Sequence, residues 1–403
     1  MKKVAVIGMG IDRGTLTLEA LDAINNAEVL SGAPRMLEMV EDLYRTDRDA
    51  AKRVYPHYLS KDITAMIETE YADSFAVLVS GDVGFYSAAS GLAEVLTAYE
   101  LRFIPGISTV SAFFARLKLP WQDAAFVSAH GRETNLVDCV RRNRLTFCLT
   151  GNNVSGIGTD LAQAGLGNVQ TYAGENLGMA QEHVYKTSVE DLTHYQAPSL
   201  TVLLFQNEEF DDRMPFGLPD DSFTRLAGIP MTKSEIRAIT LSKLNLRPTD
   251  ICWDIGAGTG SVTVEMALNA YKGRVYAVER REDAIPLIQQ NCTSFHLGNV
   301  TAVCGEAPAA LDAFPAPDAV FIGGSGGEID GIISIVLMKN PMARIVVTAV
   351  TLETVPAAMA ALAKAGLEPE IVQINAARSK KAGGVHLIEA QNPVTIISAG
   401  GRP

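Results

Sequence analysis

The chain alternates short apolar runs with longer segments in which apolar residues recur every three or four positions. The short runs predict buried strands, and the longer segments predict amphipathic helices. In the second half a helix is expected at 233–244, and another at 352–365 would end at Gly366 as a C-terminal cap. Strands are expected between and around them, at 250–255, 274–279, 300–304, 318–323 and 343–350. This order predicts an α/β domain with a mostly parallel sheet.

The end of the chain departs from this rhythm. Two strand-like runs, 370–376 and 393–398, follow one another without a helix. They predict an antiparallel pair that closes the sheet. The turn between them carries Arg378, Lys380 and Lys381 beside Ala382-Gly383-Gly384, a composition typical of a mobile loop.

The first half is also predicted to be α/β, and its two sub-blocks, 1–110 and 115–205, predict two lobes around a cleft. Its expected strands are 3–8, 75–80, 101–104, 125–128, 145–149 and 200–205. Residues 206–230 are acidic and then rich in proline and glycine, which indicates a linker. We therefore expect an N-terminal domain at 1–205 and a C-terminal domain at 231–403.

Composition narrows the class of protein. The 403 residues are 47% hydrophobic and 20% charged, as in a folded chain of two or three domains. The net charge of −12 argues against a broad nucleic-acid surface, although a local basic pocket can still bind an anion. Five cysteines without a C-x-x-C pair predict reduced thiols, and six histidines show no metal-ligand spacing. From the histidine spacing we expect no metal site. No apolar run is long enough to cross a membrane, so we expect a cytoplasmic protein.

One glycine-rich turn carries the clearest chemistry. Gly256, Gly258 and Gly260 follow a strand and open a helix, which lets the backbone approach a ligand closely. Their spacing differs from the G-x-G-x-x-G turn that binds a dinucleotide pyrophosphate. Glu279 closes the next strand, where its carboxylate could accept hydrogen bonds from both hydroxyls of a ribose. Together with Asp254 at the first strand, this pattern resembles class I S-adenosylmethionine (SAM)-dependent methyltransferases.

The resemblance implies a Rossmann-like fold and assigns roles to individual residues. The three glycines would lie against the methionine and ribose of SAM, and Glu279 would hold the ribose. For Asp254 two roles stay open, orienting the glycine turn or accepting a hydrogen bond from the SAM amine. Further residues implied near the adenine or the substrate are Glu306 and Ala307, and Gly323, Gly324 and Ser325.

Three glycine-rich turns in the first half form a second pattern. They are the turn at Gly8 and Gly10, the Gly81-Asp82 loop with Tyr86, and the stretch from Pro105-Gly106 to Ser108. In this order they resemble the tetrapyrrole (corrin/porphyrin) methylase superfamily, which binds SAM in a cleft between two lobes. Ile11 and Val83 stand where that family usually has proline, which leaves the contacts of those two loops open.

The fusion of the two modules is similar to the decarboxylating precorrin-6Y C5,15-methyltransferases of cobalamin biosynthesis. The resemblance implies one SAM site in each domain. It implies methylation of precorrin-6B at C-5 by the N-terminal domain and at C-15 by the C-terminal domain, with decarboxylation of the ring C acetate to give precorrin-8. No catalytic residue is identified; Glu306 and Ser325 are the candidates.

The implied substrate carries many carboxylates, so specific cations should meet it. The candidates are Lys233, Arg237, Arg378, Lys381 and Arg132. The same resemblance implies a homo-oligomer, a dimer or a tetramer. The net charge and the short apolar runs predict no nucleic-acid or membrane partner. Three alternatives remain: a cobalt-containing precorrin as the substrate, an RNA or protein methyltransferase with an unrelated N-terminal domain, and a SAM-binding regulator without catalysis.

Overall fold

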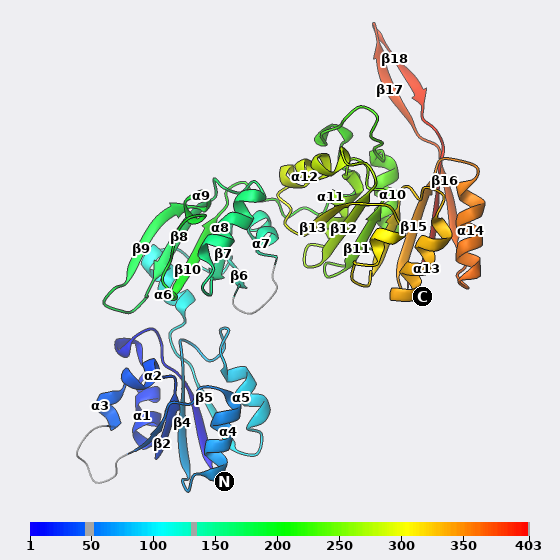
Figure 1. The fold of residues 1–403 in the computed structure, drawn as a ribbon. Coiled ribbons are helices and arrows are strands. Elements are labelled where there is room, and N and C mark those ends of the chain that lie inside the picture. The colour runs from blue at the N-terminus through cyan, green and yellow to red at the C-terminus, as the bar shows by residue number, and fades with distance from the viewer. Residues whose placement is uncertain (45–51, 130–134, 402–403) are drawn as a thin grey trace.

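A computed structural model describes residues 1–44, 52–129 and 135–401. These residues form three sheets with helices beside them, and a separate two-stranded hairpin (Figure 1). The first two sheets come from the N-terminal half and the third from the C-terminal half, as the predicted α/β architecture requires. No helix among these residues is both long and apolar enough to cross a membrane.

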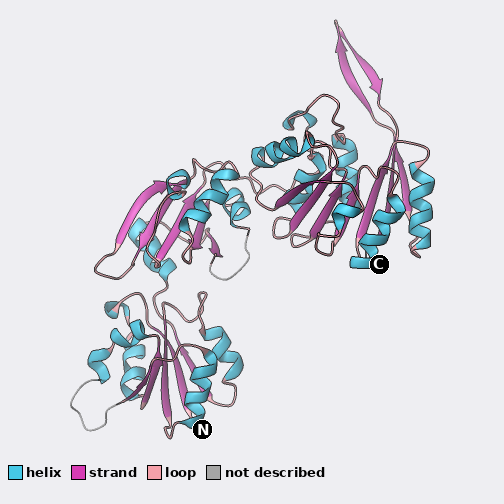
Figure 2. Ribbon diagram, in the orientation of Figure 1, coloured by secondary structure: helices cyan, strands magenta, loops and turns pink. Residues whose placement is uncertain are grey.

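The first lobe contains a parallel sheet in the order β3-β2-β4-β1-β5. Its strands are β1 (Lys3–Gly8), β2 (Val29–Gly32), β3 (Arg53–Tyr55), β4 (Ser74–Val79) and β5 (Glu100–Ile104). Its helices are η1 (Arg13–Thr15), α1 (Leu18–Asn26), α2 (Pro34–Glu38), α3 (Glu41–Tyr44), α4 (Ser60–Thr69) and α5 (Ala89–Val95). The helices cover both faces of the sheet, because its strands are buried on both sides (Figure 2).

The second lobe contains a mixed sheet in the order β6-β7-β10-β8-β9. Its strands are β6 (Ala125–Ser128), β7 (Leu145–Leu149), β8 (Gln170–Glu175), β9 (His183–Ser188) and β10 (Thr201–Gln206). Its helices are α6 (Thr109–Leu117), α7 (Leu136–Arg142), α8 (Val154–Gln163) and α9 (Val189–Leu192). Strand β10 runs antiparallel to both of its neighbours. The two lobes predicted from the sequence are therefore present.

The third sheet has seven strands in the order β13-β12-β11-β14-β15-β19-β16. Its strands are β11 (Ile251–Ile255), β12 (Arg274–Glu279), β13 (Val300–Cys304), β14 (Ala319–Ile322), β15 (Arg344–Ala349), β16 (Glu370–Ile374) and β19 (Val394–Gly400). Its helices are η2 (Asp220–Ser222), α10 (Ser234–Leu244), α11 (Ser261–Asn269), α12 (Ala284–Ser294), η3 (Ala309–Leu311), α13 (Ile329–Lys339) and α14 (Thr354–Lys364). Strand β19 pairs antiparallel with both β15 and β16, so the antiparallel closing pair expected from the sequence is confirmed.

Two apolar cores lie on opposite faces of this sheet. Cys252 and Phe321 face α11 and α12, whereas Trp253 and Val320 face α13 and α14. This alternation follows from the two-residue period of a strand. Because both faces are apolar, the central strands read as nearly continuous hydrophobic runs.

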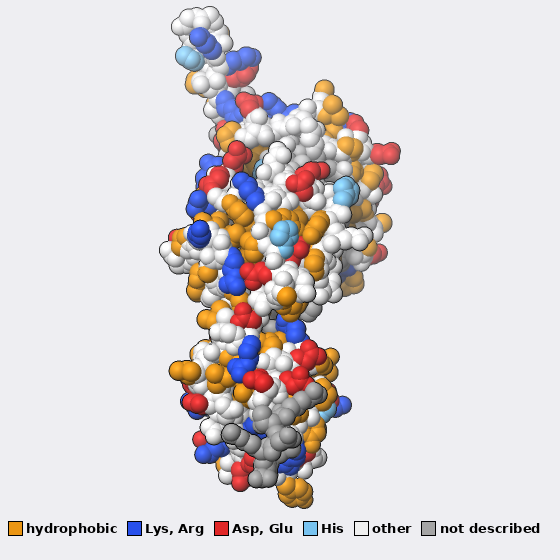
Figure 3. Space-filling view, turned by 90° about the vertical axis from the view of Figure 1, so that its left-hand side faces the viewer, with side chains coloured by type: hydrophobic (Ala, Val, Ile, Leu, Met, Phe, Trp, Pro, Cys, Tyr) orange, Lys and Arg blue, Asp and Glu red, His pale blue; other side chains and the backbone are white. Residues whose placement is uncertain are grey.

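The prediction of a turn between the last two strands is wrong. Residues there form an antiparallel hairpin, β17 (Ala377–Ala382) and β18 (Val385–Ala390), which stands away from the domain (Figures 1 and 3). Gly383, with φ of 60°, lies at its tip. We call this hairpin the arm.

The segment expected as a linker makes contacts with both domains. At its start, the Asn207 side chain donates to the carbonyl of Val140 in the second lobe, at 2.9 Å. Further on, the N–H groups of Gly217 and Leu218 donate to the Glu265 carboxylate in α11. Phe223 is part of the core of the C-terminal domain. Several residues of this stretch therefore contact one domain or the other.

Candidate functional site

A cavity of about 440 Å³ lies at the carboxyl edge of the third sheet. Its walls come from the loops that follow β11, β12, β13 and β14, as expected for a parallel sheet that binds a ligand at its switch point. Of the residues predicted for this site, the following line the cavity: Gly256, Gly258, Glu279, Glu306, Ala307, Gly323, Gly324 and Ser325. The volume is within the range of about 300–1,000 Å³ that is typical of small-molecule sites.

The glycine turn is shaped by its neighbours as well as by any ligand. Gly256 and Gly258 have φ of 75° and 56°, a region that L side chains rarely adopt. A Cβ on Gly256 would lie 2.8 Å from the nitrogen of Gly324. A Cβ on Gly258 would lie 2.5 Å from the carbonyl oxygen of Pro230. Gly260 has a different role. A Cβ at this position would meet Ile288 of α12, so this glycine allows the helix to pack closely.

Asp254 lies beneath the turn and is fully buried. Its Oδ2 accepts a hydrogen bond from the Thr263 hydroxyl of α11, and burial raises the pKa of the carboxyl to about 7. Asp254 does not line the cavity, so the possibility that it accepts a hydrogen bond from the SAM amine is not supported. The other role that the sequence left open, orienting the turn, fits its contact with the helix that the turn begins.

Glu279 lies at the end of β12 with its carboxylate fixed by two backbone groups. Gly258 N donates to Oε2 at 2.9 Å, and Arg281 N donates to Oε1 at 3.0 Å. A carboxylate oxygen can accept a second hydrogen bond, so both oxygens keep an acceptor position toward the cavity. This arrangement suits the paired hydroxyls of a ribose. The residues present therefore fit a nucleoside, and the SAM expected here.

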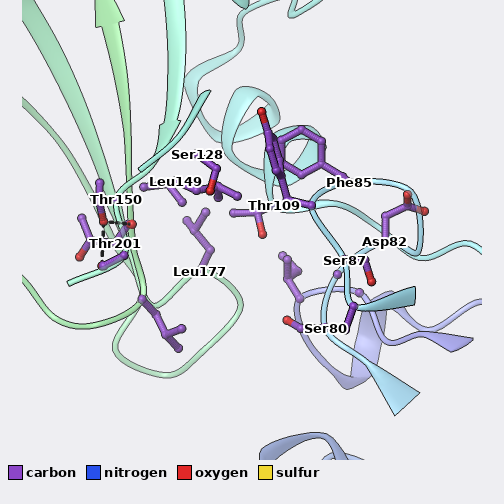
Figure 4. A pocket seen from close by; sticks show the side chains of 18 of the residues that line it. Ser80, Asp82, Phe85, Ser87, Thr109, Ser128, Leu149, Thr150, Leu177 and Thr201 are labelled. Carbon is purple, nitrogen blue, oxygen red and sulfur yellow. Dashed lines mark hydrogen bonds between the residues drawn. The ribbon is translucent and has the colours of Figure 1, made fainter. Parts of the chain in front are cut away.

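A larger cleft of about 940 Å³ lies between the two N-terminal lobes (Figure 4). Its floor comes from the carboxyl edge of the first sheet and includes Gly10, Gly81, Asp82 and Tyr86. All four were predicted from the sequence as SAM contacts. Ile11 and Val83, which depart from the family pattern, also line the cleft.

Four other residues were predicted as SAM contacts but are absent from the described residues that line the cleft: Gly8, Pro105, Gly106 and Ser108. A Cβ on Gly8 would lie 2.7 Å from Gly106 N, and a Cβ on Gly106 would lie 2.3 Å from the Gly81 carbonyl oxygen. Ser108 caps α6 by accepting a hydrogen bond from Ser111 N. Gly8 and Gly106 therefore let three loops meet backbone to backbone beneath the floor.

Asp82 ties the loops of this floor together. Its Oδ1 accepts from Gly84 N at 2.8 Å, and its Oδ2 accepts from Gly106 N at 3.2 Å. Gly10 and Gly81 exchange both backbone hydrogen bonds, at 3.0 and 3.1 Å. The cleft floor is thus a rigid backbone surface.

The opposite wall was not predicted. It comes from the end of β7 and the start of β10, with Leu149, Thr150 and Thr201 among its residues (Figure 4). Thr150 Oγ1 donates to the carbonyl of Thr201 at 2.7 Å, which joins the two strands. The sequence carried one signal, because Thr150-Gly151-Asn152 follows a buried strand as a turn would.

Comparison with known proteins gives a match to each half and one to nearly the whole chain. The tetrapyrrole (corrin/porphyrin) methylase family matches residues 3–193, and the precorrin methyltransferase domain matches 225–400. A Sinorhizobium protein named precorrin-6Y C(5,15)-methyltransferase [decarboxylating] is 31% identical over 97% of this chain and 95% of its own length. The chain belongs to this family of methyltransferases.

Two further relatives each match about half of the chain. A Pyrobaculum calidifontis protein named "Probable cobalt-precorrin-6B C(15)-methyltransferase (decarboxylating)" is 43% identical over 45% of this chain and 95% of its own length. A solved precorrin-6y C5,15-methyltransferase structure from Geobacter metallireducens GS-15 is 40% identical over 46% of this chain and 97% of that chain, with a TM-score of 0.44. Membership of the family makes the chain a methyltransferase that uses SAM.

Of the cations predicted to meet the substrate, Arg237 is placed differently by the structure. Its side chain is fully buried, and it forms ion pairs with Asp220 at 3.1 Å and Glu265 at 2.7 Å. Its remaining donors are directed to the carbonyls of Thr232 and Leu218. Arg237 therefore joins the former linker segment to α10 and α11, and its expected role as a substrate contact is wrong.

Three of the other predicted cations lie outside the walls of the C-terminal cavity. Arg378 is at the base of the arm, where it pairs with Asp220 at 2.7 Å and with Glu235 at 2.5 Å. Lys233 lies 3.9 Å from Asp220, and Lys381 is exposed on the arm. Arg132 lies outside the described residues. The structure therefore brings Arg378 and Lys233 together around one carboxylate.

Some wall residues were missed by the sequence analysis. In the C-terminal cavity they include Pro230, Thr232, Arg280 and Glu328. In the N-terminal cleft the missed charged residue is Arg35. Only the strand-end position of Arg280, beside Glu279, offered a local signal.

Proposed function

We propose that this chain methylates a precorrin at C-5 and C-15 and removes carbon dioxide from the ring C acetate, with SAM as the methyl donor. One observation carries the proposal: two separate cavities, each at the carboxyl edge of its own sheet, occur in one chain. The relative that matches 97% of this chain is named for methylation at two positions, C-5 and C-15.

We further propose that each cavity holds one SAM, with C-5 methylation in the N-terminal cleft and the other two reactions in the C-terminal cavity. Relatives that cover 45% of this chain are named for C-15 methylation and decarboxylation alone. Those two activities therefore suit a single module of this size. Glu279 and the glycine turn would hold the nucleoside in the C-terminal site, and backbone and hydroxyl groups would do so in the cleft.

Methyl transfer to an electron-rich ring carbon depends on alignment and on exclusion of water more than on an acid or base. SAM, when bound, supplies the electrophilic methyl group. The rigid floor of the cleft and the crowded turn at Gly256 favour such alignment. For decarboxylation, Glu306 and Ser325 both line the C-terminal cavity and are our candidates for moving a proton.

The substrate is proposed to be the metal-free precorrin-6B, with precorrin-8 as product. The full-length relative is named without cobalt, whereas several shorter relatives are named for cobalt-precorrin-6B. The cobalt form is therefore the second candidate, and parallel assays with both substrates decide between them.

We also propose a homo-oligomer in which the arm contacts another subunit. Isolated two-stranded hairpins are marginally stable in water, and open strand edges tend to pair. Here Val385, Leu387 and Ile388 are 59%, 55% and 75% exposed. Replacing 379–388 with a Gly-Ser turn should lower the molar mass in light scattering. A wild-type monomer at micromolar concentration would contradict this proposal.

The main test is mass spectrometry of precorrin-6B after incubation with SAM and the full-length protein. Two methyl gains and one loss of carbon dioxide are expected. The T109W variant places a large ring in the N-terminal cleft and should leave only the C-15 methylation and the decarboxylation. The E279Q variant should reduce C-15 methylation when SAM is below saturation and leave C-5 methylation unchanged. No mass change with folded, SAM-binding protein and either form of the substrate would refute the proposed function.

A further inference from the structure

One cation stands in the N-terminal cleft without an acidic partner among the described residues. Arg35 belongs to α2, just beyond the carboxyl end of β2, and lines the cleft. Among the described residues that line this cleft, it is the one Lys or Arg side chain, and Asp82 is the one acid. The charge of Arg35 therefore dominates its part of the wall.

The contacts of Arg35 leave most of its donors available. Its Nη2 donates to the Ser80 hydroxyl at 3.1 Å, and no carboxylate among the described residues pairs with it. Asp82 is engaged by Gly84 N and Gly106 N instead. A guanidinium has five N–H donors in a planar fork that matches a carboxylate. A second ligand of this shape would complete the site.

Partial burial makes the arrangement costly without such a ligand. Desolvation lowers the pKa of Arg35, although a guanidinium remains protonated at neutral pH. Other arginines of this lobe, such as Arg53 and Arg102, pair with glutamates. An unpaired, partly desolvated cation in a cavity is a common feature of anion sites.

The position of Arg35 distinguishes two ends of the cleft. In the first sheet β2 lies next to β4, on the side away from β1 and β5. Arg35 and Ser80 follow β2 and β4, whereas Gly10 and the loop after β5 lie toward the other side. An anion held by Arg35 would therefore lie at one flank of the floor.

We propose that Arg35 binds a peripheral carboxylate of the tetrapyrrole and thereby fixes which ring carbon meets the methyl donor in the N-terminal cleft. This proposal rests on the proposed function. A paired N–H···O contact specifies orientation as well as charge. The carboxylate of SAM itself has the same chemistry, so the experiment must separate the two sources.

The test compares R35Q, R35K, S80A and R102Q in the full-length protein. C-5 and C-15 methylation are followed separately by mass spectrometry, with KM for the precursor measured at saturating SAM. SAM binding is measured by calorimetry in an E279Q background, so that the N-terminal site dominates. R102Q changes an exposed arginine on β5, outside the cleft, and serves as the matched control.

R35Q is expected to raise KM for C-5 methylation about tenfold to a hundredfold, because a charged hydrogen-bonded pair is lost. C-15 methylation and SAM affinity should change less than threefold. R35K should recover part of the loss, since it keeps the charge without the fork. The increase in KM caused by S80A should be at most one tenth of the increase caused by R35Q. If the hydrogen bond from Arg35 to Ser80 had a purely structural role, the two variants would raise KM equally.

Two results would overturn the proposal. If R35Q weakens SAM binding as much as it raises KM, the carboxylate belongs to SAM. If S80A reproduces R35Q, the arginine only braces the loop after β4. A wild-type protein that turns over no precorrin would instead reject the proposed function, so the two failures are distinguishable.

Discussion

The two cavities occupy corresponding places in their sheets but are constructed differently. The C-terminal cavity opens at one sheet edge and has Glu279 on its wall, with an acceptor position free on each carboxylate oxygen. The N-terminal cleft lies between two lobes, and both oxygens of its acid, Asp82, hold backbone N–H groups. The comparison teaches that an acid beside a glycine turn can hold a ligand in one site and hold the loops in another.

The glycines differ in the same way. Gly256 needs its positive φ as well as the space beside Gly324. Gly8 is in a β-strand with ordinary backbone geometry, and the close approach of Gly81 and Gly106 excludes a side chain. Both sites therefore depend on backbone packing that a single methyl group would disturb.

The largest effect should come from R237M, which breaks the buried ion pairs beneath the C-terminal site. Glu265 would keep a buried charge without its cation, and Asp220 would keep Arg378 but lose one of its ion pairs. We therefore expect a loss of about 3–5 kcal/mol in the free energy of unfolding of this domain. Denaturation in urea measures it. C-5 methylation should survive under native conditions, and its loss together with C-15 methylation would show that the two sites do not act separately.

Asp254 should make the C-terminal domain sensitive to pH. Its pKa is raised in the folded state to about 7 from 3.8, so the unfolded chain releases the proton first as pH rises. Stability should fall between about pH 4 and pH 7, on the order of 2–4 kcal/mol. D254N should remove this dependence, whereas D330N, an exposed substitution, should retain it. A pH profile of D254N equal to wild type would contradict the assignment.

G256A and G8A test the two turns against each other. Each should destabilise its own domain by about 1–3 kcal/mol, through strain and overlap at Gly256 and through overlap alone at Gly8. G256A should reduce C-15 methylation and decarboxylation, and G8A should reduce C-5 methylation. Separate product yields from mass spectrometry check this, and a uniform loss in either variant would break the comparison.

The smallest effect concerns the two acids as ligands. E279Q should weaken SAM binding at the C-terminal site about tenfold, because one hydrogen bond from ribose to a charged acceptor is lost. D82N should change SAM binding at the cleft less than E279Q does at its site, since Asp82 contacts the protein backbone. Calorimetry on both variants measures the difference, and equal losses would show that Asp82 also holds the ligand.

Local patterns in the sequence were sufficient for much of the fold. Strand β12 lies at the predicted residues, and α10 begins one residue after its predicted start. In these segments apolar period and glycine position agree with the final packing. Strands β2, β3, β8 and β9 were missed, because short or half-exposed strands carry little periodic signal of their own.

The sequence by itself determined the glycine-rich turns of both halves, the acid at the end of β12 and the antiparallel closing pair, since these depend on residues close together in the chain. Only the tertiary structure decided that Arg237 is buried between Asp220 and Glu265, which lie 17 and 28 residues away. It also decided that Arg378 anchors the arm and that Arg35 faces the cleft. Charged residues have no period that reveals their partners, so their roles follow from which helices and strands the fold brings side by side.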